Sequence, residues 1–215
     1  WWTDVQVFPH TTPGSVSVRG RLGSLTGQPG KGTAVLQVFA RDAGSGTASE
    51  PVTAARFPVA WQATGGEFEG HLPLPTRELW DEFHPNLYRL QLTLENGTAP
   101  AQTSSVSFGF REFKAQGTQF TINGRPTFIR GTLECCIFPK TGHPPTDVNA
   151  WRRVIRIAKA HGLNNLRFHS WCPPEAAFQA ADELGMYFHV ECASWANAST
   201  TLGDGKPIDR WIYEE

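Results

Sequence analysis

The hydrophobic and polar positions of this chain follow two different periods. From Ser15 to about Phe113, apolar and polar residues alternate, and Gly, Pro, Ser and Thr separate the alternating runs. This alternation predicts strands that bury one face, and roughly six or seven short strands over about 100 residues are typical of an immunoglobulin-type β-sandwich. We expect residues 1–14 to precede the first strand. The clearest strand runs are residues 15–22, 33–40, 68–74, 87–94 and 104–110.

After Lys114 the pattern changes to short apolar runs separated by helical patterns. Residues 120–126 (FTINGRP) first place an Asn-Gly pair between apolar residues, which predicts a hairpin with a primed turn. Three apolar runs follow, at residues 126–131, 163–169 and 187–191. We expect each run to form a strand, and the first of them to be buried.

Two amphipathic helices are predicted between these three runs. Thr146 or Asp147 can cap the first helix, and Gly162 ends it. Pro173 and Pro174 open the second helix, where proline costs little because the first amides have no helical partners, and Gly185 ends it. The expected inward positions are Val148, Trp151, Ile155 and Ala158 in the first helix and Ala177, Phe178, Ala181 and Leu184 in the second.

Strands that alternate with helices predict a parallel β/α arrangement. Right-handed crossovers make the strands parallel and place the helices outside. No phosphate-binding GxGxxG motif follows the first run, so the opening of a (β/α)₈ TIM barrel is favoured over a nucleotide-binding sheet. We therefore predict two domains: an immunoglobulin-like β-sandwich at residues 1–113 and the amino-terminal part of a TIM barrel, with three βα units, at residues 114–215.

Charge and composition argue against some classes of partner for such a chain. The sequence has 19 basic and 20 acidic side chains, so no net field attracts nucleic acid or an acidic membrane surface. No run approaches the roughly 18–20 apolar residues of a membrane span. The 8 Trp residues fit either stacking on sugars or core packing. We expect no nucleic-acid partner and no membrane span.

The four cysteines all lie in the carboxyl-terminal part of the chain. They form no CxxC pair and have no His at ligand spacing, so the sequence predicts no metal site and no cofactor. The thiols are either reduced or bridged, with Cys135–Cys136 or Cys172 and a loop neighbour as possible pairs. A bridge would require an oxidising compartment. The cysteines are Cys135, Cys136, Cys172 and Cys192.

Polar side chains gather where the predicted parallel strands end, which is where α/β folds place their chemistry. Arg167 lies in an otherwise apolar strand, and its permanent charge needs a carboxylate or backbone partner. That partner is either a residue of the site or a surface carboxylate. His169 can contact a ligand hydroxyl or serve structure alone, and Trp171 can offer a flat apolar wall. The candidate site residues are Glu134, Cys135, Arg167, His169, Trp171 and Glu191.

Two of these residues raise the question of a complete glycosidase site. Retaining glycosidases hold two carboxyl groups about 5–5.5 Å apart, one as acid and base and the other as nucleophile. Glu134 and Glu191 follow the first and third strands, so their separation does not forbid this pairing. A pairing of Glu191 with Arg167 for support is the alternative. In residues 1–113 no cluster of charged or aromatic residues predicts a site.

Four segments of the chain also point to a known family. They are LWDEFHPNLYRLQLTLENG (79–97), SFGFREF (107–113), FTINGRPTFIRG (120–131) and NNLRFHSWCPPEAAFQAADELGMYFHVE (164–191). These segments resemble glycoside hydrolase family 2, the group of β-galactosidases, β-glucuronidases and β-mannosidases, and they occur in the same order as at the family's junction between the immunoglobulin-like domain and the barrel. The resemblance implies that the chain is an interior fragment of a longer enzyme.

The resemblance also implies an activity. Family 2 enzymes are exo-acting and retaining, and their catalytic glutamates follow the fourth and seventh barrel strands. Both are expected beyond Glu215, so the chain alone should be inactive and should depend on the rest of its polypeptide, with a carbohydrate as substrate. Residues 205–215 (GKPIDRWIYEE) resemble the start of the third barrel helix.

The resemblance assigns supporting roles to two positions. Arg167 matches an arginine that holds the nucleophile carboxylate. Glu191 matches an acidic residue that in some members assists a divalent metal or a sugar hydroxyl. Residues 130–145 depart from the galactosidase pattern, so no sugar is assigned. The competing hypothesis is a non-catalytic carbohydrate-binding or assembly module.

Overall fold

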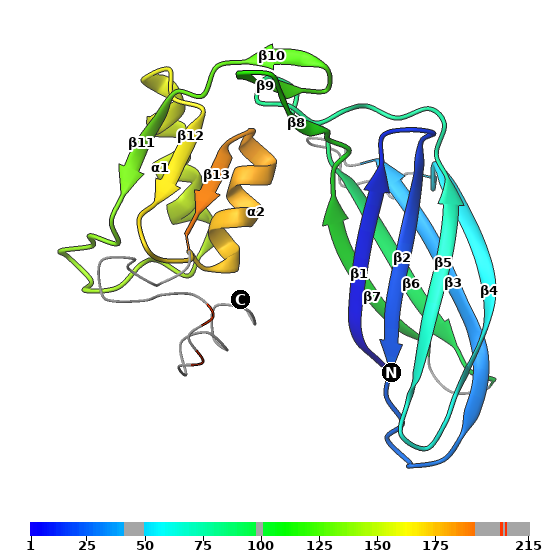
Figure 1. Ribbon diagram of the computed structural model, residues 1–215. Coiled ribbons are helices and arrows are strands. Elements are labelled where there is room, and N and C mark those ends of the chain that lie inside the picture. Colours follow the sequence, from blue (N-terminus) through cyan, green and yellow to red (C-terminus); the bar gives the residue numbers. More distant parts are fainter. Residues whose placement is uncertain (41–49, 98–100, 192–202, 204, 206–215) are drawn as a thin grey trace. The chain divides into compact units, whose positions relative to one another are not determined.

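The computed structural model describes residues 1–40, 50–97, 101–191, 203 and 205. These residues are mostly β-structure with two helices, and the chain divides into two compact units, Trp1–Pro126 and Thr127–Glu215 (Figure 1). The sequence prediction placed the domain change earlier, at residue 113. Cys192 and the expected third helix lie outside the described residues.

In the described part of the first unit, two antiparallel sheets form a sandwich. Strands β1 (Trp2–His10), β2 (Ser15–Leu22) and β5 (Gly66–Pro73) form one sheet in the order β1-β2-β5. Strands β3 (Gly30–Ala40), β4 (Thr53–Trp61), β6 (Tyr88–Glu95) and β7 (Gln102–Phe108) form the other in the order β4-β3-β6-β7. One apolar cluster draws side chains from both sheets, including Val16, Val18, Leu36, Leu72 and Leu92.

The alternation seen in the sequence explains which side chains of these strands point to the core and which to the surface. In β2, Val16 and Val18 are fully buried, whereas Arg19 and Arg21 are exposed on the other face. A β-strand turns successive side chains to opposite faces, so one strand supplies both core and surface. The strand expected at residues 15–22 is therefore confirmed with the same bounds.

Two strands of the sandwich were missed by the sequence prediction. Strand β1 occupies residues that were expected to precede the first strand, and β4 was not predicted. Both lie at the edge of their sheets. Edge strands bury less of their apolar face, and β1 contains Pro9, which edge strands tolerate, so the inward residues of both strands are mostly half-buried although they alternate with exposed ones.

A small ribbon follows the sandwich. Strands β8 (Phe113–Gln116), β9 (Gln119–Ile122) and β10 (Arg125–Thr127) form a sheet in the order β10-β9-β8. Asn123 and Gly124 link β9 to β10 with φ values of 52° and 77°. Positive φ at both central residues is the requirement of a type I′ turn, so the predicted Asn-Gly hairpin is confirmed.

The second unit contains a parallel sheet and both helices. Strands β11 (Gly131–Glu134), β12 (Asn165–Phe168) and β13 (Tyr187–Val190) pair in chain order, all parallel. Helix α1 (Val148–Ala160) connects the first two strands and α2 (Glu175–Leu184) connects the last two. The predicted cap of α1 is confirmed, because the Asp147 side chain accepts a 2.9 Å hydrogen bond from the Ala150 amide. The core of this unit lies between sheet and helices and includes Trp151, Ile155, Leu166 and Phe168.

The first parallel strand differs from its prediction in place and burial. The run at residues 126–131 is not the strand, because β11 begins at Gly131, and Phe128 within that run is 78% exposed. The strand is also not buried, since Leu133 is 49% exposed. The reason is position: β11 lies at the sheet edge, and Leu133 faces away from the helices, in register with Arg167.

One helical position was also predicted wrongly. Phe178 was expected to face inward, but it is 37% exposed and makes an edge contact with the partly buried Phe188 at 5.6 Å. The packed face of α2 is instead made by Ala176, Ala177, Ala180 and Ala181. Four alanines allow close packing of the helix, which a phenylalanine in that face would prevent.

Candidate active-site region

The candidate site lies at the carboxyl ends of the parallel strands in the second unit. Leu133, Arg167 and His189 are in register on neighbouring strands, so they share one face of the sheet. On β12, the two residues that flank Arg167, Leu166 and Phe168, point to the other face and are buried against the helices. The sheet thus has one face covered by helices and one that carries polar groups.

Arg167 and Glu191 form the centre of this region. The Nε–H of Arg167 donates to Glu191 Oε1 at 2.6 Å, and Arg167 Nη2 lies 2.5 Å from the same oxygen. The backbone amide of Ser170 donates to Glu191 Oε2 at 2.9 Å. Ser170, two residues after the end of β12, adopts a φ of 59°, in the left-handed region. Both carboxylate oxygens of Glu191 are therefore held by donors.

These donors set the charge state of Glu191. The Ser170 amide and then the Arg167 guanidinium stabilise the carboxylate and lower the pKa of Glu191, against a smaller opposing effect of burial. Arg167 remains 43% exposed, and its Nη1 group makes no hydrogen bond within the described part of the chain. The pair therefore presents a fixed cation with an unused donor.

Glu134 organises the neighbouring strand end through both backbone and side chain. Its carbonyl accepts hydrogen bonds from the His169 amide at 2.9 Å and from Trp171 Nε1–H at 3.3 Å. Its Oε2 accepts from the Cys136 amide at 3.0 Å. Trp171 packs edge to face on Phe168 at 5.2 Å, so much of its ring belongs to the core. Glu134 thus ties β11 to the residues that follow β12.

The described cysteines are free thiols. Cys135 Sγ lies 3.8 Å from His169 Nδ1, and burial, followed by the charge of Glu134, raises the pKa of Cys136. No bridge joins Cys135 to Cys136, which corrects that alternative: adjacent cysteines close only a strained ring, and here each thiol stands alone. Cys172 is also free. Within the described ranges no group of three or more His, Cys, Asp or Glu side chains is placed to hold a metal.

The structure therefore brings together all six residues that the sequence singled out. Glu134 links to His169 and Trp171, Cys135 lies beside His169, and Arg167 pairs with Glu191. Sequence reasoning missed Ser170, because its contribution is a backbone amide in an unusual conformation. No residue type signals that in advance.

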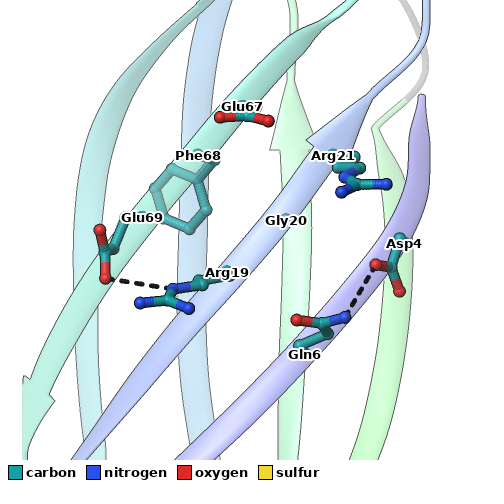
Figure 2. A pocket seen from close by; sticks show the side chains of 8 residues that line it. All are labelled: Asp4, Gln6, Arg19, Gly20, Arg21, Glu67, Phe68 and Glu69. Carbon is teal, nitrogen blue, oxygen red and sulfur yellow. Dashed lines mark hydrogen bonds and ion pairs between the residues drawn. The ribbon is translucent and has the colours of Figure 1, made fainter. Parts of the chain in front are cut away.

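Sequence reasoning also missed a depression on the first unit. It lies on the outer face of the β1-β2-β5 sheet and holds about 520 Å³ (Figure 2). Its walls are the polar side chains that alternate with the core residues of these strands. They are Asp4, Gln6, Arg19, Arg21, Glu67 and Glu69, with Gly20 and Phe68 between them.

None of the helices in the described ranges is long and apolar enough to cross a membrane.

Similar proteins were found by sequence and by structure. A β-galactosidase of Vibrio cholerae is 31% identical over 121 residues, covering 55% of this chain and 12% of that protein. An exo-β-D-glucosaminidase of Amycolatopsis orientalis is 30% identical over 141 residues, covering 60% of this chain and 12% of that protein. The chain thus matches about an eighth of the length of these relatives.

Solved structures show the same fold at lower identity. A glycosyl hydrolase family 2 member from Bacteroides cellulosilyticus superposes with a TM-score of 0.75 at 21% identity, over 87% of this chain and 24% of that one. A β-glucuronidase 2 of Bacteroides uniformis superposes with a TM-score of 0.75 at 20% identity, over 95% of this chain and 24% of that one. Finally, the model of the glycosyl hydrolases family 2 matches residues 2–111, half of the sequence. The chain belongs to glycosyl hydrolase family 2.

Proposed function

We propose that this chain is part of a retaining, exo-acting glycoside hydrolase that removes a terminal sugar from an oligo- or polysaccharide. Residues 1–113 form an immunoglobulin-like sandwich, and residues 114–215 lead into a TIM barrel whose catalytic glutamates lie beyond Glu215. Family membership and relatives named for β-galactosidase and exo-β-D-glucosaminidase activity support this proposal. The three-plus-four strand arrangement and the parallel β11-β12-β13 sheet agree with it.

The observation that carries the proposal is the Arg167–Glu191 pair. Glu191 fixes the guanidinium at 2.6 Å and is itself fixed by the Ser170 amide at 2.9 Å, so the cation cannot turn away from the strand ends. A preoriented guanidinium costs no reorganisation when it stabilises another carboxylate. Arg167 then holds the nucleophile ionised, and Glu191 acts as a positioning residue.

The same contacts argue against Glu134 and Glu191 as the catalytic pair. A general acid needs a raised pKa, whereas the pKa of Glu191 is lowered by its donors. Both oxygens of Glu191 are already held, and Glu134 uses an oxygen on the Cys136 amide. We therefore assign Glu134, Cys135, His169 and Trp171 to substrate contact or support.

The first experiment compares the 215-residue chain with the longer polypeptide on a panel of aryl β-glycosides. We expect hydrolysis by the longer polypeptide alone, and proton NMR should show the product first in the substrate's anomeric configuration. Turnover by the 215-residue chain that Glu134→Gln or Glu191→Gln abolishes would instead place the catalytic pair in this chain. Sugar binding without turnover by either polypeptide would favour the non-catalytic module.

The second experiment tests Arg167 in the longer polypeptide. Loss of one preoriented donor to developing charge lowers kcat by about 10²–10³-fold, and we expect this from Arg167→Ala. Arg167→Lys should recover only a small part, because a lysine cannot contact two carboxylates with a planar fork. Arg156, exposed on α1, provides the matched control, and Arg156→Ala should leave kcat unchanged. An unchanged kcat in Arg167→Ala would refute the assigned role.

A further inference from the structure

We propose that the outer face of the β1-β2-β5 sheet holds a second carbohydrate-binding site, which takes an uncharged oligosaccharide. The site belongs to the first unit alone and does not involve the strand ends of the second unit. It goes beyond the proposed hydrolysis, because it would bind glycan without acting on it.

The shape of this face is the first step. The depression of about 520 Å³ described above shares Arg21 and Glu67 with a second depression of about 560 Å³. The second depression includes Trp1 and Thr3 and the turn Ala63–Gly66. Ligand sites commonly measure about 300–1,000 Å³. We call the two together the sandwich groove, and its size suits more than one sugar unit.

The order of charges across the groove is the second step. Strand register aligns Gln6, Arg19 and Glu69 in one row and Asp4, Arg21 and Glu67 in the next. Each arginine on the central strand therefore has a hydrogen-bond acceptor on both neighbouring strands. The opposite charges nearly cancel, so the groove has no strong attraction for a charged ligand.

The two rows differ in how many ion pairs and hydrogen bonds their side chains form with one another. Arg19 lies 3.5 Å from Glu69 and over the Phe8 ring at 5.2 Å, and Gln6 donates to Asp4 at 3.2 Å. By contrast, neither an ion pair nor a hydrogen bond joins the side chains of Arg21 and Glu67 to their neighbours in the described chain (Figure 2). A solvated strand face normally gains from cross-strand pairs of opposite charge. Here the donors of Arg21 and the acceptors of Glu67 stay open at the middle of the groove.

An aromatic surface at one end of the groove is the third step. The Trp1 side chain is 39% exposed, yet its ring packs so closely on Gly23 that a Cβ there would lie 2.7 Å from ring atoms. Gly23 therefore supports the indole from one side and leaves the rest of it open. Aromatic rings stack on the apolar faces of sugars, while hydroxyl groups both donate and accept hydrogen bonds.

These three features together select the ligand class. Hydroxyls can accept from Arg21 and donate to Glu67 without bringing charge into the groove. A uronate or sulfate would face Asp4, Glu67 and Glu69, and a cation would face Arg19 and Arg21. The groove therefore fits a neutral oligosaccharide, with one sugar unit on Trp1 and the next at Arg21 and Glu67.

The test titrates the 215-residue chain with cellohexaose, mannohexaose and xylohexaose, followed by calorimetry and tryptophan fluorescence. We expect saturable binding of at least one hexaose with a dissociation constant of about 1 mM or below. Trp1→Ala, Arg21→Gln and Glu67→Gln should each weaken it about tenfold. Gly23→Ala should weaken it too, because the added methyl displaces the Trp1 ring while the indole remains.

Matched variants outside the groove provide the controls. Phe83→Ala removes a 70% exposed aromatic residue, and Arg56→Gln removes an exposed arginine paired with Glu95 on the other sheet. Both should bind like the unchanged chain, and circular dichroism checks that every variant folds. The proposal fails if no hexaose binds saturably or if the groove variants bind normally. It also fails if only polygalacturonate binds and about 0.3 M NaCl abolishes that binding. In the longer polypeptide, Arg21→Gln should leave aryl-glycoside hydrolysis unchanged, which separates this proposal from the proposed hydrolysis.

Discussion

The two units of this chain use their sheets in opposite ways. In the sandwich, both sheets turn an apolar face to one common core, and the outer faces carry mostly polar side chains. In the second unit, the parallel sheet has one face against α1 and α2, and the other carries Leu133, Arg167 and His189. The sandwich is thus closed around its core, whereas the parallel sheet of the second unit has one face that the helices do not cover.

One carboxylate in each unit makes the contrast specific. The side chain of Asp81 in the first unit is 8% exposed and accepts from the amides of Phe83 at 2.8 Å and His84 at 2.7 Å. Arg125 also contacts it. Glu191 has the same kinds of partner, but its side chain is 24% exposed. The same motif therefore serves a closed structure in one unit and an open site in the other.

The largest expected effect is on the core of the second unit. Trp151 is fully buried, and its Nε1–H donates to the Pro145 carbonyl at 2.7 Å. We expect Trp151→Ala to lower the free energy of unfolding of that unit by about 3–5 kcal/mol, because it leaves a cavity and an unpaired carbonyl. Calorimetry should show one transition shifted down and the sandwich transition unchanged.

The matched change in the sandwich reverses this pattern. Leu36 is fully buried in the common core of the sandwich. Leu36→Ala should lower the free energy of unfolding of the sandwich by about 2–5 kcal/mol and leave the unfolding transition of the second unit unchanged. If either substitution moves both transitions together, the two units share one cooperative core, and the contrast between a closed and an open unit breaks down.

The next effect concerns Asp81. Burial alone would raise the pKa of Asp81, but the His84 and Phe83 amides and the charge of Arg125 outweigh it and lower the pKa. We expect Asp81→Ala to cost the sandwich unit about 1–3 kcal/mol, because two amides and a guanidinium lose their acceptor. Urea unfolding measures this cost. The exposed Glu78→Ala change provides the control, and an equal loss in both would show that the Asp81 contacts contribute nothing particular.

A smaller effect is expected at the start of α1. The Asp147 carboxylate caps the Ala150 amide at 2.9 Å, and removal of such a cap costs about 1 kcal/mol. Asp147→Ala should lower the free energy of unfolding of the second unit by that amount. Asp147→Ser should restore most of it, because serine also caps helices. Equal loss in the two variants would mean that the carboxylate stabilises through charge on the helix dipole instead of through the cap.

Local patterns in the sequence predicted the elements that local chemistry determines. The strand at residues 15–22, the Asn123–Gly124 turn and the Asp147 cap all depend on residues close in sequence. The pairing of Arg167 with Glu191 was one of the alternatives that the sequence left open, because a charged arginine in an apolar strand needs a carboxylate or backbone partner and parallel strands align their ends.

Features that depend on tertiary context could not be predicted in the same way. Strand β1 pairs with β2 along most of its length, and this pairing with a later segment of the chain is a tertiary feature. Ser170 contributes an amide that no side chain announces. The sandwich groove places Asp4 and Glu67 on either side of Arg21 only through the strand order β1-β2-β5, so residues more than 60 positions apart in sequence line one depression.

The smallest effect should appear in the pH dependence of the open unit. Because the pKa of Glu191 is lowered in the folded state, its ionised form stabilises folding at pH values above its ordinary pKa of 4.5. This stabilisation is lost as the pH falls through the folded pKa. Melting followed by fluorescence between about pH 7 and 3 should therefore show a steeper acid slope for the second transition in the unchanged chain than in Glu191→Gln.

The two curves should converge at low pH, where a protonated Glu191 resembles the glutamine, and Arg167→Ala should reduce the slope because it removes one of the two donors. The sandwich transition, in the same melting curve, serves as an internal control and should be identical in all three proteins at each pH. Equal slopes for the second transition would mean that the partly exposed carboxylate gains nothing from its donors. Solvent would then already screen the pair, and Arg167 would owe its fixed position to the strand alone.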